Sequence, residues 1–352
     1  MTRPNHFVIK REMGWGTWNL PNKAIPLANF SAAGNRARIE ERLTGATRSL
    51  SRRYPGAKMP SGSLETPYWS EDMGWFWAAA LLHFITTLTP VGGTLTREHG
   101  ILPDDPANVA SLSAQTQWSG ATGVNYLGLV LNSLTISCRA GEAARLSADW
   151  IARDEAKVGG VWDYDGLTAS PAIIATPTYF AATIPYLIFT GASIVSGGTP
   201  TLDPTKKYYT IAGGTVESGI EGFTMTIENN VDARVLFGAP TPQQAVAQDR
   251  DITFSFDYAP GEDIGYKWYD EYRAGSQIAL QFGLKGPLIE TTFYRETVIT
   301  LPLVDFDPTN MPDLTGSKTR KTRAVTGKAL EHSSGYDIGV MLRDTVNSYA
   351  AV

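Results

Sequence analysis

Apolar and polar residues alternate along several short segments of the chain. In residues 252–258 every second side chain is apolar, and residues 145–152, 222–228 and 277–284 follow the same pattern. Successive side chains of a β-strand point to opposite faces of its sheet, so the alternation predicts strands with one buried face and one face in water. The sequence therefore predicts a mainly β protein built from antiparallel sheets.

A buried helix is expected over residues 70–88. Ser70 is a suitable N-cap, and Glu71 and Asp72 favour the positive end of a helix dipole. The centre of the segment is apolar almost all round, which is typical of a helix buried between layers. His83 lies within it and is expected to be a core histidine.

A second short helix is expected over residues 262–275. Ile264, Trp268 and Tyr272 follow one another at the four-residue spacing that places side chains on one face of a helix. Gly275 is a plausible stop at the C-terminal end of this helix.

The chain is expected to divide into an arm and two β domains. Residues 1–35 resemble an irregular arm, whose aromatic residues pack either on the chain's own body or on a neighbouring subunit. Residues 36–160 and 161–352 are expected to form one β domain each, because 352 residues suit two domains and each half contains hairpin strands and one short helix. The aromatic residues of the arm are Trp15, Trp18 and Phe30.

The two halves of the chain resemble each other weakly. Residues 125–138, followed by 144–150, parallel residues 218–230, followed by 251–258. This similarity indicates an internal duplication, although two unrelated β-hairpins can produce the same pattern.

The composition is that of a globular protein. Hydrophobic residues make up 43% of the chain, enough for a sizeable core without a disulfide or metal to stabilise it. The net charge of -5 argues against tight binding of nucleic acid, but it is compatible with nucleic acid sliding past the protein. Residues 36–60 are locally basic and form either a solvated face or a contact with a subunit or nucleic acid. The basic residues are Arg36, Arg38, Arg42, Arg48, Arg52, Arg53 and Lys58.

The sequence contains no motif that points to catalysis. A P-loop, a GxGxxG turn, GxSxG, HExxH and CxxC are all missing. Asp163 and Asp165 have the residue types of a glycosidase carboxylate pair, but a turn before a strand is the favoured interpretation. We assign no catalytic, cofactor-binding or metal-binding residue and expect no cofactor and no enzyme activity. The four histidines are scattered along the chain at His6, His83, His99 and His332.

Cysteine use and hydropathy suggest the compartment. Cys138 is the single cysteine, and its apolar surroundings predict a buried core thiol that suits a reducing cytoplasm. The first residues show no pattern of a signal peptide. The longest apolar run, residues 73–85, is shorter than the roughly 18 residues of a membrane span, so no stable membrane association is expected.

Several segments together resemble the tail tube, or major tail, proteins of long-tailed bacteriophages. Residues 217–286 contain a strand that ends in an Asn-rich turn, a variable loop, a strand with alternating Thr and Ser, an acidic turn, a short aromatic helix and a further alternating strand. Residues 63–81 and 126–137 resemble the same family in the first half. The resemblance covers most of the chain in outline.

The resemblance implies both a fold and an assembly. It implies two antiparallel β-sandwich or barrel domains of tail-tube type, each with a short flanking helix. It also implies rings, either of three chains with pseudo-sixfold symmetry or of six chains, stacked into a tube inside the virion. Implied partners are further copies, the tape measure protein, tail terminator and baseplate proteins, and viral DNA that passes without sequence-specific binding.

Two other functions remain open from the sequence. One is a different all-β tail component, such as a terminator, a baseplate protein or an adaptor, which forms a single ring or binds a partner. The other is a carbohydrate-binding or carbohydrate-active β protein that uses Trp and Tyr side chains as sugar platforms.

Overall fold

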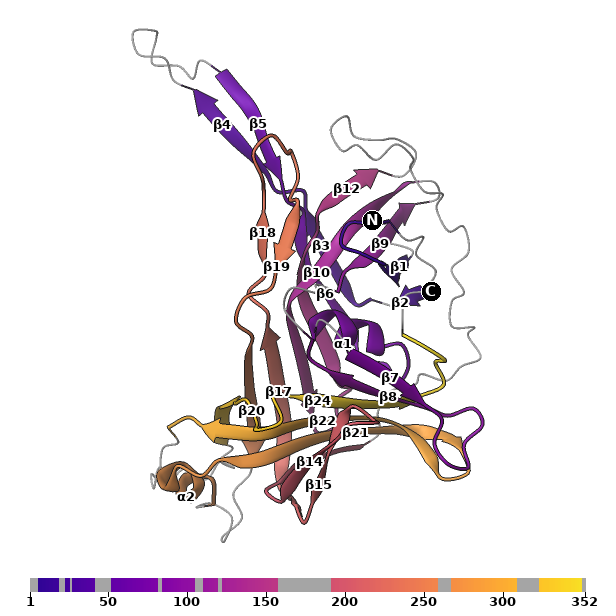
Figure 1. Cartoon of the computed structure of the whole chain (residues 1–352), viewed down its shortest axis with the longest axis vertical. Coiled ribbons are helices and arrows are strands. Elements are labelled where there is room, and N and C mark those ends of the chain that lie inside the picture. The colour runs from indigo at the N-terminus through magenta and orange to yellow at the C-terminus, as the bar shows by residue number, and fades with distance from the viewer. Residues whose placement is uncertain are drawn as a thin grey trace.

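Antiparallel strands make up most of the structure (Figure 1). The computed structural model describes residues 6–18, 23–25, 27–41, 52–81, 84–104, 110–119, 122–157, 191–258, 267–308 and 323–349. Every strand pair within these ranges is antiparallel, and two short helices accompany the sheets. The expected mainly β, sandwich-type fold is confirmed.

One long sheet, here called the main sheet, runs through both halves of the chain. Seven of its strands lie side by side, and the end of an eighth strand closes the series. In spatial order the strands are β3 (Asn29–Ala33), β6 (Ser61–Pro67), β11 (Arg145–Ile151), β10 (Thr122–Arg139), β17 (Ile220–Glu228), β20 (Asp251–Tyr258), β23 (Arg323–Ala329) and the end of β22 (Phe293–Phe306).

Two outer sheets cover the buried face of the main sheet. The long strands β10 and β22 each belong to the main sheet at one end and to an outer sheet at the other. The first outer sheet contains β2 (Lys23–Ile25), β1 (His6–Arg11), β9 (Leu112–Ser119), β10 and β12 (Asp154–Lys157). The second contains β16 (Thr215–Val216), β13 (Gly191–Ser196), β21 (Ile278–Glu290), β22, β24 (Gly339–Asp344), β8 (Arg97–Leu102) and β7 (Phe84–Leu88).

The core lies between the main sheet and these two covers. Trp150 of the main sheet packs edge-on against Tyr126, in the outer part of β10, with ring centroids 5.0 Å apart. Phe223 of the main sheet stacks on Phe282 of β21, also at 5.0 Å. Burial of such large aromatic rings supplies much of the hydrophobic free energy of a sandwich.

The order of elements in the first half of the chain is repeated in the second half. A hairpin that carries a projecting ribbon is followed by a helix and then by a long strand that switches sheets. The elements of the first half are, in order, β1, β2, β3, β6, α1 (Gly74–Ala80), β9, β10, β11 and β12. Their equivalents in the second half are, in the same order, β13, β16, β17, β20, α2 (Lys267–Ala274), β21, β22, β23 and β24. The projecting ribbons also correspond, namely β4 (Arg36–Glu41) with β5 (Arg52–Lys58), and β18 (Asp232–Arg234) with β19 (Gln244–Val246).

This correspondence differs from the one suggested by the sequence. Residues 125–138 belong to β10 and residues 218–230 to β17, and these two strands are antiparallel neighbours in the main sheet. When two repeated units lie side by side in one sheet, their equivalent strands must run in the same direction, so the antiparallel strands β10 and β17 are not equivalent. The pattern matched because both segments are alternating strands, and β17 corresponds instead to β3, four strands away.

The predicted strands are confirmed where the alternation is strongest. Residues 252–258 lie in β20, where Ile252, Phe254, Phe256 and Tyr258 are all buried. Residues 145–152, 222–228 and 277–284 fall largely within β11, β17 and β21. The period of two therefore identifies strands of the main sheet and of the second outer sheet correctly.

The first expected helix is much shorter than predicted. α1 spans Gly74–Ala80, its N-cap Met73 makes no side-chain capping bond, and residues 84–88 form strand β7. Asp72 adopts a left-handed conformation with φ 68°, so the chain turns there before the helix begins. Ile85, Thr86 and Thr87 are β-branched and favour the strand. His83 lies outside the described residues.

The second expected helix is confirmed in its described part. α2 spans Lys267–Ala274, Trp268 is buried and Tyr272 packs against the core. Gly275 follows the helix with φ 62°, a conformation that glycine adopts without strain. Ile264 lies outside the described residues.

The N-terminal residues pair with the body of the chain. β1 pairs with β9 and β3 pairs with β6. Phe30 stacks on Trp150 at 5.7 Å between ring centroids, and the guanidinium of Arg153 lies 5.5 Å from the ring of Trp15. Trp18 is partly buried. These aromatic residues contact their own chain, which was one of the two alternatives for this segment.

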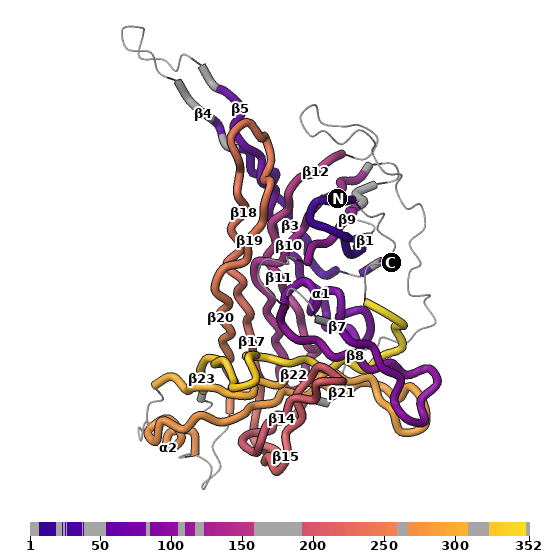
Figure 2. The backbone as a smooth tube through the Cα atoms, viewed as in Figure 1, coloured from indigo at the N-terminus to yellow at the C-terminus, as the bar shows by residue number. Residues whose placement is uncertain are grey.

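The basic segment forms a ribbon that projects from one end of the molecule (Figure 2). Strands β4 and β5 build it, and residues 42–51 lie outside the described residues. At its base Lys58 is buried, with Nζ 2.9 Å from Asp154 Oδ1 and 2.7 Å from the carbonyl oxygen of Glu155. The second ribbon joins it through a bond from the Lys58 N–H to the Pro240 carbonyl oxygen at 2.8 Å.

Removal of Asp154 is expected to destabilise the fold strongly. The side chains of Lys58 and Asp154 are 5% and 3% exposed, so Asp154→Ala removes the carboxylate that lies 2.9 Å from a buried ammonium and should lower the free energy of unfolding by about 3–5 kcal/mol. Arg145→Ala is the matched control, because Arg145 is 63% exposed in its ion pair with Glu65, and it should cost less than about 1 kcal/mol. Urea unfolding measures both variants, and equal losses would contradict the role of the buried pair.

Asp72 is expected to make stability depend on pH. Burial raises the pKa of Asp72 to about 6, although Lys23 Nζ lies 2.8 Å from its carboxylate. The unfolded chain therefore loses this proton at lower pH than the folded chain, and stability falls as pH rises from about 4 to about 6. Asp72→Asn tolerates the left-handed backbone and removes this loss.

The free energy of unfolding of Asp72→Asn minus that of the native chain should increase by about 3 kcal/mol between pH 3 and pH 7, because two pKa units correspond to that energy. Urea titrations at several pH values measure the difference. A difference that stays constant across this range would show that Asp72 titrates alike in both states.

Candidate assembly surface

The face of the main sheet opposite the core is lined by hydroxyl groups. Along β17, for example, Thr224 and Thr226 alternate with the buried Phe223 and Met225. The strand register places the hydroxyl side chains of neighbouring strands in continuous rows across both halves of the chain. This polar face includes Ser31, Ser63, Ser133, Thr135, Ser137, Ser147, Thr224, Thr226, Thr253, Ser255 and Thr326.

Several hydroxyl groups of the polar face bond to one another or to a neighbouring acid. The Thr135 and Thr226 hydroxyls are 3.0 Å apart across the junction between the two halves. The Ser133 hydroxyl donates to Asp149 Oδ2 at 3.1 Å. Cross-strand pairs of this kind stabilise a sheet modestly and leave a smooth, hydrophilic surface.

Acidic residues outnumber basic ones on the polar face. Arg145 bonds Glu65 at 2.8 Å, and this bond, with help from Asn29, lowers the pKa of Glu65. Lys328 Nζ lies 3.6 Å from Asp251 Oδ1. The described acids of this face are Glu65, Asp149, Glu228, Asp251, Asp257 and Asp305, and the described bases are Arg139, Arg145 and Lys328. The surface therefore carries a net negative charge.

Both ends of the main sheet are open among the described residues. At one end, β3 pairs with β6 but with no other described strand. At the other end, the Phe306 N–H bonds the side chain of its own neighbour, Asp305, at 3.1 Å. An unpaired strand edge presents peptide groups that pair readily with a further strand. These two edges are the candidate sites of contact between copies.

The second projecting ribbon exposes apolar side chains at its tip. Val235, Leu236 and Phe237 are exposed, and Phe237 completely so. Large apolar side chains gathered at a loop tip are typical of a contact surface. One signal in the sequence could have identified this site, namely an apolar triplet directly before the turn-forming Gly238.

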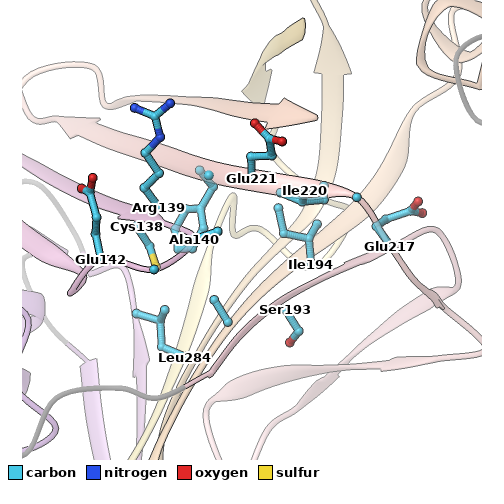
Figure 3. Close-up of a pocket in the computed structure, with 15 residues that line it drawn as sticks. Cys138, Arg139, Ala140, Glu142, Ser193, Ile194, Glu217, Ile220, Glu221 and Leu284 are labelled. Atoms are coloured by element: carbon cyan, nitrogen blue, oxygen red, sulfur yellow. The ribbon is translucent and has the colours of Figure 1, made fainter. Parts of the chain in front are cut away.

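A cavity of about 300 Å³ lies where β10 ends and β17 begins (Figure 3). Cys138, Ile194 and Ile220 line it together with Glu217, whose carboxylate bonds Lys267 and the Ser196 hydroxyl. The thiol of Cys138 is half-buried against the core rather than fully buried, and burial raises its pKa. A raised pKa reduces the fraction of the cysteine that is thiolate, which is the form that acts as a nucleophile.

The histidines occupy separate places. His99 is buried and bonds Thr87, Asp344 and the Val346 carbonyl oxygen. His332 bonds Ser334. His6 belongs to β1, while Asp163 and Asp165 lie outside the described residues. Within the part of the chain that the structure describes, no group of three or more His, Cys, Asp or Glu side chains is arranged to hold a metal ion.

None of the described helices has the length and hydropathy needed to cross a membrane.

The fold and this surface define a class of protein. A mainly β chain with a broad polar sheet face, open strand edges and projecting ribbons has the architecture of a structural assembly subunit. A family model described as "Phage tail tube protein" matches residues 5–327. The chain therefore belongs to the phage tail tube protein family, which confirms the resemblance found in the sequence. No curated protein matches the sequence.

Proposed function

We propose that this tail protein assembles with further copies into rings, and that stacked rings form the tube through which the phage genome passes. The observation that carries this proposal is a polar sheet face whose sheet is open at both edges. Closure of such sheets into a ring pairs every edge and removes the liability of an unpaired strand. We propose no catalytic activity and no cofactor for this protein.

We propose that each ring contains three chains with pseudo-sixfold symmetry. Each half of the chain supplies four strands of the main sheet in the same order, so three chains supply six equivalent sets. About two dozen strands spaced roughly 4.8 Å apart enclose a backbone diameter of about 37 Å, which strand tilt widens further. This is a channel rather than a packed core.

The domain division fits this arrangement. We propose two tube units, residues 36–160 and 161–352, as expected from the sequence. Because β1, β2 and β3 pair within the first unit, we extend that unit into residues 1–35. The projecting ribbons then lie at one end of the proposed ring, where they meet the next ring.

The polar face is suited to line the channel. Its net negative charge repels phosphate groups, and several of its hydroxyl groups bond to one another or to a neighbouring acid. DNA then passes without adhering and without being read. The proposed partners are the tape measure protein within the channel, and the tail terminator and baseplate proteins at its ends. The protein is made in the bacterial cytoplasm and functions in the virion.

Negative-stain electron microscopy of the purified protein tests the assembly. Concentrated samples should contain stacked rings with a central channel and threefold averages, because edge pairing is a concentration-dependent association. Ala32→Lys with Ala33→Lys is the matched control, since charges on the β3 edge should block pairing while the monomer stays folded. Monomers at every concentration of the native chain would contradict intrinsic self-assembly, and sixfold averages would contradict three chains.

Lysine on the polar face should make the tube bind DNA. Ser147→Lys with Thr226→Lys adds six positive charges to a ring of three chains, so assembled tubes should bind short duplex DNA at least about tenfold more tightly at low salt, with steep salt dependence. Val216→Lys on β16 with Met13→Lys in the bend after β1 is the control for added charge and should leave DNA binding unchanged, because both exposed positions lie outside the main sheet. Fluorescence anisotropy measures the binding, and equal gains in both variants would contradict a channel lined by this face.

A further inference from the structure

The chain contains one complete junction between its own two halves, and we propose that it is the template for the junction between chains. In this proposal β3 of one copy pairs with the end of β22 of the next copy, with Ala32 opposite Phe306 and Ala33 opposite Asp305. The inference rests on the proposed ring and adds the residues and the strand register that close it.

The internal junction is formed by β10 and β17. Ser133 lies opposite Glu228, Leu134 opposite Ile227, and Thr135 opposite Thr226 in an antiparallel register. Leu134 and Ile227 are buried, so this junction is packed like the rest of the core.

The two outer edges are the topological equivalents of these strands. β22 corresponds to β10, because each leaves an outer sheet, enters the main sheet and pairs with the strand that follows it. β3 corresponds to β17, because each is the first strand of a hairpin that carries a projecting ribbon. If the repeat continues around the ring, the end of β22 should receive β3 as β10 receives β17.

Pairs that recur in both halves of the chain show which residues of the two hairpins are equivalent. Leu64 pairs with Ala148 and Phe254 pairs with Gly327, each an apolar residue opposite a small one. At Gly327 a Cβ atom would lie 2.3 Å from the Asp305 carbonyl oxygen, so the small residue is required there.

Buried tyrosines confirm this alignment of the two hairpins. Tyr68 and Tyr258 follow Leu64 and Phe254 at the same distance along the chain, and both are buried. On β3, the other strand of the first hairpin, Phe30 lies opposite Leu64.

The equivalent residues on the two edges then follow from the pairing lists of the strands. Met225 lies opposite Phe254, so Phe30 is equivalent to Met225 and Ala32 is equivalent to Ile227. Ala148 lies opposite Leu134, and Gly327 lies opposite Phe306.

Phe306 is therefore equivalent to Leu134. Because Leu134 faces Ile227 in the internal junction, Phe306 should face Ala32 of the next copy.

The direction of the peptide groups at the internal junction provides an independent check. The Asn229 N–H donates to the Asn132 carbonyl oxygen at 2.8 Å. In an antiparallel ladder every second pair exchanges hydrogen bonds, so Leu134 and Ile227, two residues further along, form a hydrogen-bonded pair. The proposed Phe306–Ala32 pair must do the same.

The peptide groups of Phe306 point outward, as the proposal requires. The Asp307 N–H donates to the Thr326 carbonyl oxygen at 2.9 Å, so Asp307 faces β23. Adjacent residues of a strand direct their peptide groups to opposite sides. The Phe306 N–H accordingly bonds the side chain of Asp305 instead of a strand.

The peptide groups of Ala32 also point outward. The Met59 N–H donates to the Asn35 carbonyl oxygen at 2.9 Å, so the peptide groups of Asn35 point towards the strand that contains β6. Peptide groups alternate in direction along a strand, so those of Ala33, two residues earlier, also point towards β6. Ala32 therefore directs its peptide groups away from β6. Phe306 and Ala32 thus present matching donors and acceptors at the two open edges.

Burial differs between the two junctions as the proposal expects. Ile227 is completely buried at the internal junction, whereas its equivalent Ala32 is exposed on β3. Pairing with a second copy covers Ala32. The exposed edge is therefore an incomplete copy of a junction that the chain has already formed once.

A disulfide between chains tests the register. Asp305→Cys with Ala33→Cys, in a Cys138→Ser background, places two thiols directly opposite each other in the proposed junction, within disulfide range. Oxidation of assembled protein should give covalent closed trimers on a non-reducing denaturing gel. A mixture of the two single variants should give covalent dimers only, which shows that the bond joins different chains.

Two matched pairs control for geometry. Ser133→Cys with Glu228→Cys is the same pair at the internal junction and should form a disulfide within one chain. Asp305→Cys with Ser31→Cys is displaced by two residues and should form none, because diagonal neighbours lie about 7–8 Å apart.

Proline variants test the same junction without thiols. Ala32→Pro removes an outward N–H and should raise the concentration needed for assembly at least about tenfold while the monomer stays folded. Ser31→Pro removes an N–H that faces β6 and should destabilise the monomer itself.

The outcomes separate the register from the ring. If micrographs show rings but the Asp305–Ala33 pair does not crosslink, or the displaced pair crosslinks equally well, the proposed register is wrong and the ring stands. If neither the native chain nor any variant assembles, both the ring and its junction are wrong. Crosslinked trimers from the direct pair alone would establish the junction.

Discussion

Unpaired peptide groups at the edges of a sheet are the constraint on which this structure depends. A sheet of seven strands and the end of an eighth buries its interior peptide groups in pairs, but it leaves one row of donors and acceptors at each end. At the β22 end the Phe306 N–H turns to its own Asp305, and at the β3 end small alanine side chains lie exposed. Another strand satisfies a whole row of these groups at once, which supports the proposal that further copies complete the sheet.

The same alternation that builds the core also builds the polar face that we propose as the channel wall. Because successive strand residues point to opposite faces, each apolar residue that enters the core places a polar neighbour on the other side. The register then aligns these neighbours into rows, as Thr135 and Thr226 show across the junction of the two halves. A wall without exposed apolar patches and with a net negative charge follows from the strand pattern and needs no separate device.

Local features of the fold could be predicted from the sequence, and long-range pairing could not. Alternation identified β20 and its buried residues, and Gly275 identified the end of α2. The start of α1 depends on the turn at Asp72, whose left-handed conformation leaves little trace in the residue type. The internal repeat was misaligned because β10 and β17 share a pattern although they are neighbours. Strand order is set by contacts between residues far apart in the chain, so the open edges appear only in the fold.

The two kinds of junction differ in a way that suits their roles. The internal junction buries large apolar side chains, Leu134 and Ile227, and it is tethered covalently, so it forms once when the chain folds. At the outer edges the proposed partner of Phe306 is only an alanine, and Pro308, two residues further on, has no N–H to offer. An edge with small side chains and a missing donor pairs weakly in isolation, which lets single chains remain separate while they fold. In the proposed ring every chain makes two such contacts, and the contact that closes the ring forms within an assembly that is already joined. The proposed ring can therefore be stable although each edge pairs weakly, and weak edges protect the single chain from aggregation.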